Sequence, residues 1–399
     1  MNKQMRIVLL LAIVASIIGM VWYGVKDTGD VKSVVESQKA GKAIEAKKAL
    51  DDMKKINLSG YVSLDIEPFL NDQRVRDKLQ QSNIAISFAR LGSRSMATNL
   101  KQSVSTKNNN LPDFYISSGV VAGNQISEMA KSLGMNPSSS SPLYTPLVMA
   151  TWKPIAEILK SNGIASLDQA STDNAAIYNI DNNKLLDAML KKKRWVELKN
   201  SAAFPVTRSV LVSTTDVASS NSAAMYLALM SFSLNNSNVV EKFDQAESSA
   251  IALAELFYRQ GYQENYVNGN FDDYTAVGMG KSPLAFIYEN QMVSYARTQG
   301  KIKQNMVLAY PTPTIFNKQV FVALSEPAKK FADILSNDKA LQTIALEYGF
   351  RSGPNKEFVA EALKNGLRTK EEIIDVIDPP AHTFMTKMIE VVASQAKTK

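Results

Sequence analysis

Short apolar segments alternate along the chain with longer segments in which apolar residues recur every three or four positions. The short segments predict strands over residues 56–64, 84–89, 111–117, 143–150, 207–213, 282–288, 307–310 and 319–324. The longer segments predict helices over residues 72–81, 96–102, 123–133, 155–159, 184–190, 223–229, 245–260, 327–335, 338–348, 370–376 and 383–396. Loops are predicted over residues 136–142 and 261–274. Strands that alternate with helices indicate an α/β domain with a mainly parallel sheet.

The N-terminus differs from the rest of the chain. Residues 7–25 are almost wholly apolar and uncharged, and Lys3 and Arg6 precede them. About 20 such residues span a bilayer as a helix, and no convincing cleavage site follows. We therefore expect an uncleaved signal anchor in the bacterial inner membrane, with the rest of the chain on the periplasmic side. Residues 31–55, rich in Ala, Lys and Glu, predict a helical stalk, and their broken apolar stripe favours a solvated spacer over a coiled coil.

Composition narrows the function classes. The 399 residues allow two or three domains, and the formal charge of +7 is too diffuse to indicate nucleic-acid binding. The basic run at residues 191–194 is expected to be solvated at a helix C-terminus, with a lipid or nucleic-acid patch as the alternative. Cys is absent and His382 is the single His, which argues against nucleophilic triads and multi-His metal sites. We expect no enzyme, no metal site and no cofactor, although carboxylate or metal chemistry stays open.

Small polar residues close two of the predicted strands. Ser93 lies in the turn after residues 84–89, and Ser117 and Ser118 end the strand at 111–117. Ligands of such sheets bind beyond the carboxyl ends of the strands. These three serines are therefore candidates for a shared site.

The stretch from residue 207 to residue 229 is central to the predicted site. It reads as a strand, a polar break and a buried helix, which places a helix N-terminus at the edge of the sheet. Asn221 and Ser222 stand at that terminus, where free N–H groups suit an anion or an acceptor group. Helix capping alone is the alternative, because Ser and Asn are preferred cap residues.

Tyr288 and Glu289 close the apolar strand at 282–288. A carboxylate at the end of a buried strand needs a partner. That partner is either a structural Arg or Lys, or a ligand, and the sequence favours neither. The nearby Gly-Lys-Ser at residues 280–282 does not form a phosphate-binding loop, because Thr275 occupies the position of the first required Gly.

The order of these elements resembles the type II extracellular solute-binding proteins, the receptors of ATP-driven importers. The clearest motif is the segment Tyr-Pro-Thr-Pro-Thr at residues 310–314, followed by apolar segments at 320–324 and 328–335 and by Gly349-Phe350-Arg351. Gly92-Ser93-Arg94 is similar to a first-lobe ligand turn of that family, and residues 143–150 to its outgoing crossover. The usual member is secreted or held by a lipidated Cys, so a retained anchor is a departure.

The resemblance implies a two-lobed α/β fold of the periplasmic-binding-protein (Venus-flytrap) type II, with an N-terminal transmembrane helix and a stalk. Its expected parts are an anchor at 1–25, a stalk at 26–55, a first lobe at 56–149 and 310–399, and a second lobe at 150–309. A small polar or anionic ligand is expected between the lobes, for delivery to a membrane permease of an ABC-type importer. The expected ligand-binding residues are Ser93, Arg94, Ser117, Ser118, Asn221, Ser222, Tyr288 and Glu289. An envelope sensory or scaffold protein that uses the same fold to bind another protein is the alternative.

Overall fold

The computed structural model describes residues 55–106, 111–169, 171, 176–261, 263, 269–352 and 355–397. The chain divides into a unit at Met1–Lys55 and a unit at Ile56–Lys399, and the fold below is that of the second unit. The predicted anchor at residues 7–25 lies outside the described residues, as does the predicted stalk up to residue 54. In the described part of the chain, every helix is too short or too polar to cross a membrane.

One nine-stranded mixed sheet runs through the second unit in two sections that share strand β4 (Ser138–Trp152). The first section has the order β2-β1-β3-β9-β4, with β2 (Ile84–Arg90), β1 (Ile56–Val62), β3 (Phe114–Ser118) and β9 (Phe316–Ala323). In it, β1 pairs in parallel with β2 and β3, whereas β9 runs antiparallel to β3 and to residues 138–146 of β4. The parallel β2-β1-β3 arrangement brings the ends of these three strands to one edge.

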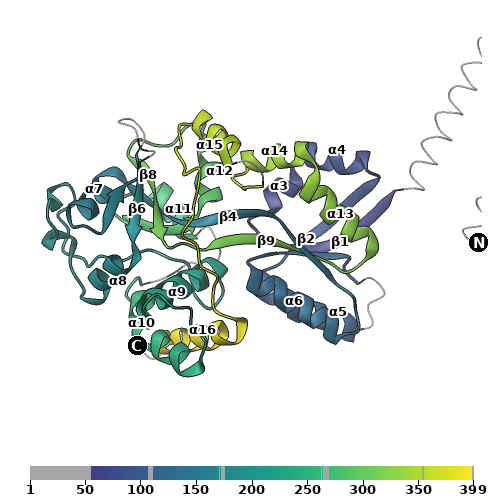
Figure 1. Cartoon of the computed structure of the whole chain (residues 1–399), viewed down its shortest axis with the longest axis horizontal. Coiled ribbons are helices and arrows are strands. Elements are labelled where there is room, and N and C mark those ends of the chain that lie inside the picture. Colours follow the sequence, from purple (N-terminus) through teal and green to yellow (C-terminus); the bar gives the residue numbers. More distant parts are fainter. Residues whose placement is uncertain are drawn as a thin grey trace, which may run out of the picture. The chain divides into compact units, whose positions relative to one another are not determined.

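The second section continues from the C-terminal part of β4. Residues 147–152 of this strand pair with β7 (Leu284–Tyr288) on one side and β8 (Met306–Thr312) on the other, both antiparallel. Strand β6 (Ile177–Asp181) runs parallel to β8, and the short β5 (Ala165–Leu167) closes the edge. The chain therefore crosses from the first section to the second along β4 and returns through β8 and β9, as Figure 1 shows.

Helices cover both faces of the first section. On one face lie α3 (Glu67–Asn71), α4 (Gln73–Gln81), α13 (Glu326–Asn337) and α14 (Lys339–Glu347); on the other lie α5 (Met96–Ser105) and α6 (Val120–Ser132) (Figure 1). The strand residues alternate between these faces: Phe114 and Ile116 belong to one core and Tyr115 to the other. Because successive side chains point to opposite faces and both faces are covered, every residue of β3 is buried.

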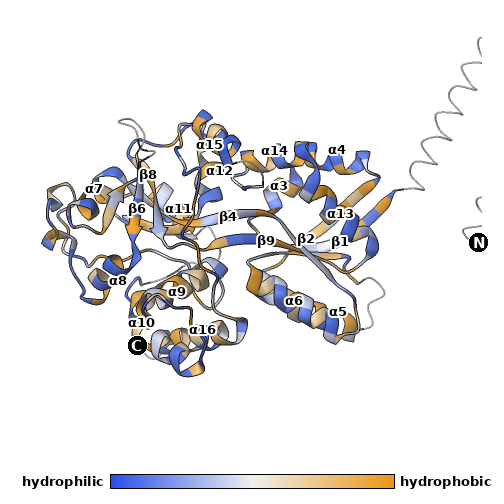
Figure 2. Ribbon diagram, in the orientation of Figure 1, coloured by the Kyte–Doolittle hydropathy of each residue, from blue (hydrophilic) through white to orange (hydrophobic). Residues whose placement is uncertain are grey.

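The second section is covered in the same way. One core contains residues of α7 (Lys153–Ser161), α8 (Asn182–Leu190), α9 (Asn221–Leu234), α10 (Phe243–Tyr258) and α16 (His382–Lys397). The other contains residues of α11 (Gly269–Ala276), α12 (Glu289–Gln299) and α15 (Asn355–Lys364). Outer helices such as α6 and α16 carry both hydrophilic and hydrophobic residues (Figure 2), as expected for helices that bury one face. Short 3₁₀ turns complete the unit at Ser93–Ser95, Trp195–Glu197 and Ser201–Ala203.

The C-terminal helix α16 packs with the second section. Met385, Met388, Ile389 and Val392 belong to the core that α9 and α10 share. The segment before it runs past the crossover, where Thr314 N donates to Asp375 O and Ile377 N donates to Thr314 O. The last part of the chain, which the sequence analysis assigned to the first lobe, therefore contacts helices assigned to the second lobe.

Three predicted elements are wrong. Residues 207–213 do not form a strand, because they pair at Ser209 and Ser213 through single bridges instead of a continuous ladder. Residues 370–376 are not helical: the carbonyls of Lys370 and Glu371 accept from Arg351, and Ile374 remains 88% exposed. Within the predicted loop at 261–274, residues from 269 onward form α11.

Other elements differ in extent or were missed. Strand β4 begins at Ser138, inside the predicted loop at 136–142, because its serines pair with β9. Helices α12 and α15 were missed because their own segments contain too few apolar residues to show a helical period. The predicted end of the helix at 338–348 is confirmed: Gly349 follows α14 with φ of +77°. A side chain there would also meet Asn290 Cα at 2.5 Å, so only Gly fits.

Candidate functional site

The two serine turns of the first section meet. Ser118, at the end of β3, donates its backbone N–H to Ser93 Oγ across 2.8 Å. Ser93 begins the 3₁₀ turn after β2, and both side chains are almost fully buried. Because β2 and β3 run parallel on either side of β1, their carboxyl ends are held at one edge.

Asp65 lies at the same edge and was missed by the sequence analysis. Its Oδ2 accepts hydrogen bonds from Ser118 Oγ at 3.2 Å, from Asn317 Nδ2 at 3.3 Å and from Gln319 Nε2. Asn317 also donates to Ser118 Oγ at 2.8 Å. Asn317 and Gln319 are buried on β9 and orient a carboxylate that is itself half-buried. One feature of the sequence could have identified Asp65: it stands just after β1, as Ser93 stands just after β2.

The opposite wall comes from the second section. Asn221 opens α9, and its Nδ2 donates to the hydroxyl of Tyr288 at 3.1 Å. Tyr288 ends β7 and is fully buried. Burial, and next the nearby Asp65 carboxylate, raise the pKa of the Tyr288 phenol well above its usual range. Tyr288 is therefore a neutral group that can both donate and accept near Asp65.

Glycine allows these walls to approach closely. Gly119, between β3 and α6, has φ of +90°, and a Cβ there would lie 3.0 Å from Asn221 Nδ2. A side chain at this position would be strained and would crowd the amide. The end of β3 and the start of α9 therefore meet because residue 119 is Gly.

Thr215, Ser220 and Ser222, at the start of α9 and in the loop before it, form a buried hydroxyl cluster. Thr215 Oγ1 donates to Ser220 Oγ at 2.7 Å, and the Ser222 hydroxyl lies 2.9 Å from Thr215 and 3.0 Å from Ser220. Ser220 occupies the N-cap position, but its side chain makes no capping hydrogen bond. The cluster instead holds Ser220 at the surface of the pocket, with Ser222 behind it.

Arg94 connects the two walls. Its Nη1 donates to the carbonyls of Val217, at 3.2 Å, and Ala218, in the loop that leads into α9. Burial lowers the pKa of Arg94, and the nearby Asp216 opposes this shift. Arg94 lines the pocket on one side and, on the other, a second cavity of about 500 Å³ that Asn221 and His382 also line. Arg94, Ser219 and Asn221 are therefore common to the linings of both cavities.

The pocket between the walls has a volume of about 230 Å³. Five of the eight predicted residues line it: Ser93, Arg94, Ser118, Asn221 and Tyr288. Its lining also includes Ser220, beside the two predicted residues that open α9, and residues that the sequence analysis did not name, among them Ser63, Asp65 and Arg90. Arg90 is paired with Glu67 at 2.6 Å, so its charge is already balanced.

Three predicted residues are absent from this lining. Ser117 is fully buried within β3, and Ser222 lies in the hydroxyl cluster behind Ser220. Glu289 forms a bidentate pair with Arg351, with Nε–Oε2 of 2.8 Å and Nη2–Oε1 of 3.0 Å. The neutral Tyr310 hydroxyl donates to the same carboxylate.

The Glu289–Arg351 pair is almost inaccessible, with side chains 0% and 2% exposed. Burial would lower the pKa of Arg351, but the Glu289 carboxylate outweighs it and the pKa is raised. Arg351 therefore stays charged and neutralises Glu289. The sequence left open whether Glu289 pairs with a structural Arg or Lys or with a ligand, and the structure shows that it pairs with a structural Arg.

The basic run at 191–194 and His382, which the sequence analysis also considered, make contacts with neighbouring side chains. Within the basic run at 191–194, Lys191 pairs with Asp187, Lys192 with Glu255 and Arg194 with Glu197. His382 Nε2 lies 2.7 Å from Gln125 Nε2, between α16 and α6. Among the described residues, no group of three His, Asp or Glu side chains is arranged to hold a metal ion.

This chain is similar to known proteins in its structure. A scan against protein-family models and a search of curated proteins each found no match. Among solved structures, an ABC-transporter solute-binding protein from Thermotoga lettingae bound to α-D-tagatose is similar with a TM-score of 0.55 and 11% identity, covering 86% of this chain and 94% of that one. The periplasmic binding protein AfuA from Actinobacillus pleuropneumoniae, bound to fructose-6-phosphate, has a TM-score of 0.51 and 15% identity, covering 86% and 99%.

The substrate-binding protein of an ABC transporter from Agrobacterium tumefaciens gives a TM-score of 0.51 at 15% identity, covering 86% of this chain and 94% of that one. At such low identity, these likenesses establish the fold. The resemblance that the sequence analysis drew is thus confirmed at that level, and the described chain has the two-section α/β fold of the ABC-transporter solute-binding proteins.

Proposed function

We propose that this protein is a membrane-anchored extracytoplasmic solute-binding protein that captures a small polar or anionic ligand between its two sheet sections for an ABC-type importer. The observation that supports it is the convergence of Asp65, Ser118, Asn221 and Tyr288 on one pocket. The first two come from the first section and the others from the second. A ligand that touches both walls would favour the conformation in which they meet.

The groups around the pocket favour a ligand with several hydroxyls. Asp65 is a pure acceptor, Asn221 and Tyr288 can each donate and accept, and Ser93 has a hydroxyl proton to donate. The start of α9 adds backbone N–H groups that suit a phosphate or carboxylate on the same ligand. Sugars and sugar phosphates combine these features, and the structural neighbours named above hold α-D-tagatose and fructose-6-phosphate.

The predicted anchor would place the binding unit next to the membrane. Residues 7–25 would hold the chain in the inner membrane, and the stalk would keep the binding unit near a permease. Such tethering raises the local concentration at the partner. Carbonate extraction of membranes from cells that express the full chain tests the anchor: retention in the pellet is expected, and release would contradict it.

A thermal-shift panel on the full chain tests ligand capture. The panel contains D-tagatose, D-fructose, fructose-6-phosphate, amino acids and inorganic oxyanions. A true ligand at 100 times its dissociation constant should add about 2.7 kcal/mol to the free energy of unfolding. Asn221→Ala should abolish the shift, whereas Lys191→Ala, on the distant surface run, should retain it. If no compound shifts the midpoint, the proposal fails.

An envelope sensory or scaffold role is the second candidate, because the predicted anchor and stalk suit a fixed protein as well as a receptor. In that case a membrane partner should co-purify in stoichiometric amount with the full chain. The complex should survive Ser118→Ala and Asn221→Ala, which remove pocket groups. Loss of the complex in both variants would instead favour the ligand-binding role.

A further inference from the structure

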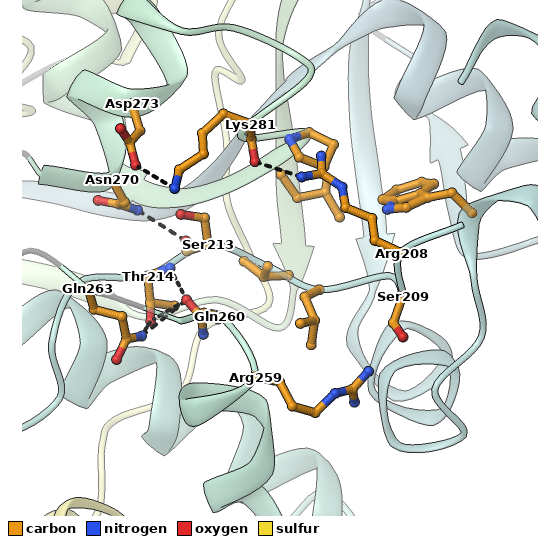
Figure 3. A pocket seen from close by; sticks show the side chains of 15 residues that line it. Arg208, Ser209, Ser213, Thr214, Arg259, Gln260, Gln263, Asn270, Asp273 and Lys281 are labelled. Carbon is orange, nitrogen blue, oxygen red and sulfur yellow. Dashed lines mark hydrogen bonds and ion pairs between the residues drawn. The ribbon is translucent and has the colours of Figure 1, made fainter. Parts of the chain in front are cut away.

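A cavity of about 330 Å³ lies in the second section, away from the pocket described above and without a lining residue in common with it. It is enclosed by the irregular segment at 208–214, the C-terminal end of α10, the start of α11 and the residues that lead into β7. Figure 3 shows Arg208 and Lys281 on one side of this cavity, and Arg259 and Gln260 on the opposite side. Its volume lies at the lower end of the range for small-molecule sites.

The lining carries an excess of positive charge. Arg208, Arg259 and Lys281 are cationic, and Asp273 is the single carboxylate among the lining residues. Asp273 lies 3.9 Å from Lys281 Nζ, which is a long ion pair (Figure 3). Glu255 reaches Arg259 only at 3.9 Å and is paired with Lys192 at 2.6 Å. Neither Arg259 nor Lys281 is therefore closely neutralised.

Arg208 is the least compensated of the three. In the described part of the chain, no carboxylate lies within ion-pair distance of its guanidinium. Its Nη1 donates to the carbonyl of Lys281 at 3.2 Å, and its guanidinium stacks over the Phe204 ring at 5.5 Å. Its side chain is exposed, so the charge is accessible to a ligand. A guanidinium without a carboxylate partner is a favourable partner for an anion.

A second feature also indicates an acceptor. Trp195 lines the cavity and is 0% exposed, yet its indole Nε1–H has no hydrogen-bond partner among the described residues. Most buried side-chain polar atoms in proteins have a hydrogen-bond partner. Leu211, Pro283 and Leu284 supply an apolar wall beside these donors. The cavity thus combines unpaired donors with a surface for a carbon skeleton.

We propose that this cavity is a second binding site, for a small organic anion whose carboxylate or phosphate group contacts Arg208, with Arg259 on the opposite side and the Trp195 indole N–H as further donors in the lining. The guanidinium groups supply forked donors that match the oxygens of either anion. Inorganic phosphate alone would leave the apolar wall uncovered, so an anion with a carbon body binds more tightly.

Calorimetry on the full chain tests this site, with citrate, phosphoenolpyruvate and inorganic phosphate as probes. At least one organic probe should bind with a dissociation constant below about 1 mM, more tightly than inorganic phosphate. Arg208→Gln should weaken binding about tenfold or more. Arg208 is exposed at the mouth, so the variant is expected to fold, and circular dichroism checks this.

Two controls locate the binding. Arg194→Gln removes a nearby cation that is paired with Glu197 and does not line the cavity, so it should leave the affinity unchanged. Asn221→Ala, in the first pocket, should also leave it unchanged. Titration should alter the tryptophan emission of the natural chain, and Trp195→Phe should remove that change. Absence of saturable binding of the organic probes, equal weakening by Arg194→Gln, or loss of binding in Asn221→Ala would each overturn the proposal.

Because this cavity shares no residue with the first pocket, the two proposals fail separately. If no panel compound shifts the unfolding midpoint, but citrate binds equally well to the natural chain and to Asn221→Ala, the proposal of a second site stands and that of the first pocket fails. Binding of the panel ligand that Arg208→Gln leaves unchanged would support the first pocket alone.

Discussion

Asp65 and Glu289 are two carboxylates that follow buried strands, yet the structure uses them in opposite ways. Glu289 comes directly after β7 and is enclosed by Arg351 and Tyr310, with 0% of its side chain exposed. Asp65 comes shortly after β1, receives its hydrogen bonds from neutral side chains and lines the pocket. A carboxylate that is neutralised by a buried Arg is part of the core, whereas one held by amides and a hydroxyl at a pocket is, in our proposal, a group that a ligand contacts.

The largest expected effect concerns the enclosed carboxylate. Arg351→Met leaves Glu289 buried without a cation, which should lower the free energy of unfolding by about 3–5 kcal/mol. Urea denaturation of the full chain measures it. Lys191→Met is the control, because its pair with Asp187 is exposed and should contribute at most about 1 kcal/mol. Similar losses in the two variants would show that Glu289 is not held as described.

The next effect concerns the open carboxylate. Asp65→Asn removes the charge at the pocket, and a hydrogen bond to a charged group contributes about 1.5–3 kcal/mol, so affinity for the panel ligand should fall about tenfold or more. Stability should change by about 1 kcal/mol, because the amide oxygen still accepts. Glu289→Gln should do the reverse, with a greater loss of stability and unchanged affinity. If both variants lose affinity equally, the distinction between the two carboxylates is wrong.

A smaller effect is expected across the pocket. Tyr288→Phe removes the hydroxyl that accepts from Asn221 at 3.1 Å, so stability should fall by about 1 kcal/mol. Affinity for the panel ligand should fall as well, because the phenol faces Asp65 in the same pocket. Thermal unfolding with and without the ligand separates the two losses. Unchanged affinity would place the ligand away from this wall.

The smallest effect concerns the hydroxyl cluster. Ser222→Ala removes two short contacts, with Thr215 and Ser220, and should cost about 1 kcal/mol or less. Ligand affinity should stay unchanged, because Ser222 lies behind Ser220. Isothermal titration with the panel ligand measures it, beside Ser118→Ala, which should weaken binding. A loss for Ser222→Ala as large as for Ser118→Ala would mean that the residue contacts the ligand.

The sequence pattern identified most of the strands and helices, since their apolar periods are strong. It failed at residues 207–213, where Val210 and Val212 pack into the core but the backbone pairs only through single bridges, at Ser209 and Ser213. Periodicity reports which side chains are buried, and it does not report whether a hydrogen-bonding neighbour is present. Helix α12 was missed for another reason, because its segment is too polar to show a helical period.

Ser93, Ser118, Asn221 and Tyr288 could be predicted as pocket residues because each stands at the end of a strand or the start of a helix, positions that a sequence reveals. Asp65 could not be separated from other acidic residues in turns, because its partners Asn317 and Gln319 are more than 250 residues away. The pair of Glu289 with Arg351, separated by 62 residues, was hidden for the same reason.

The sequence by itself determined the alternation of strands and helices, the polar ends of the strands, and the scarcity of nucleophilic and metal-binding side chains, because these are local or compositional properties. The tertiary structure alone decided which polar ends meet, which carboxylate is neutralised and which cations remain without an anion. Those outcomes depend on contacts between segments distant in the chain, and the charge and burial of a side chain are set by whatever lies opposite it in the folded protein.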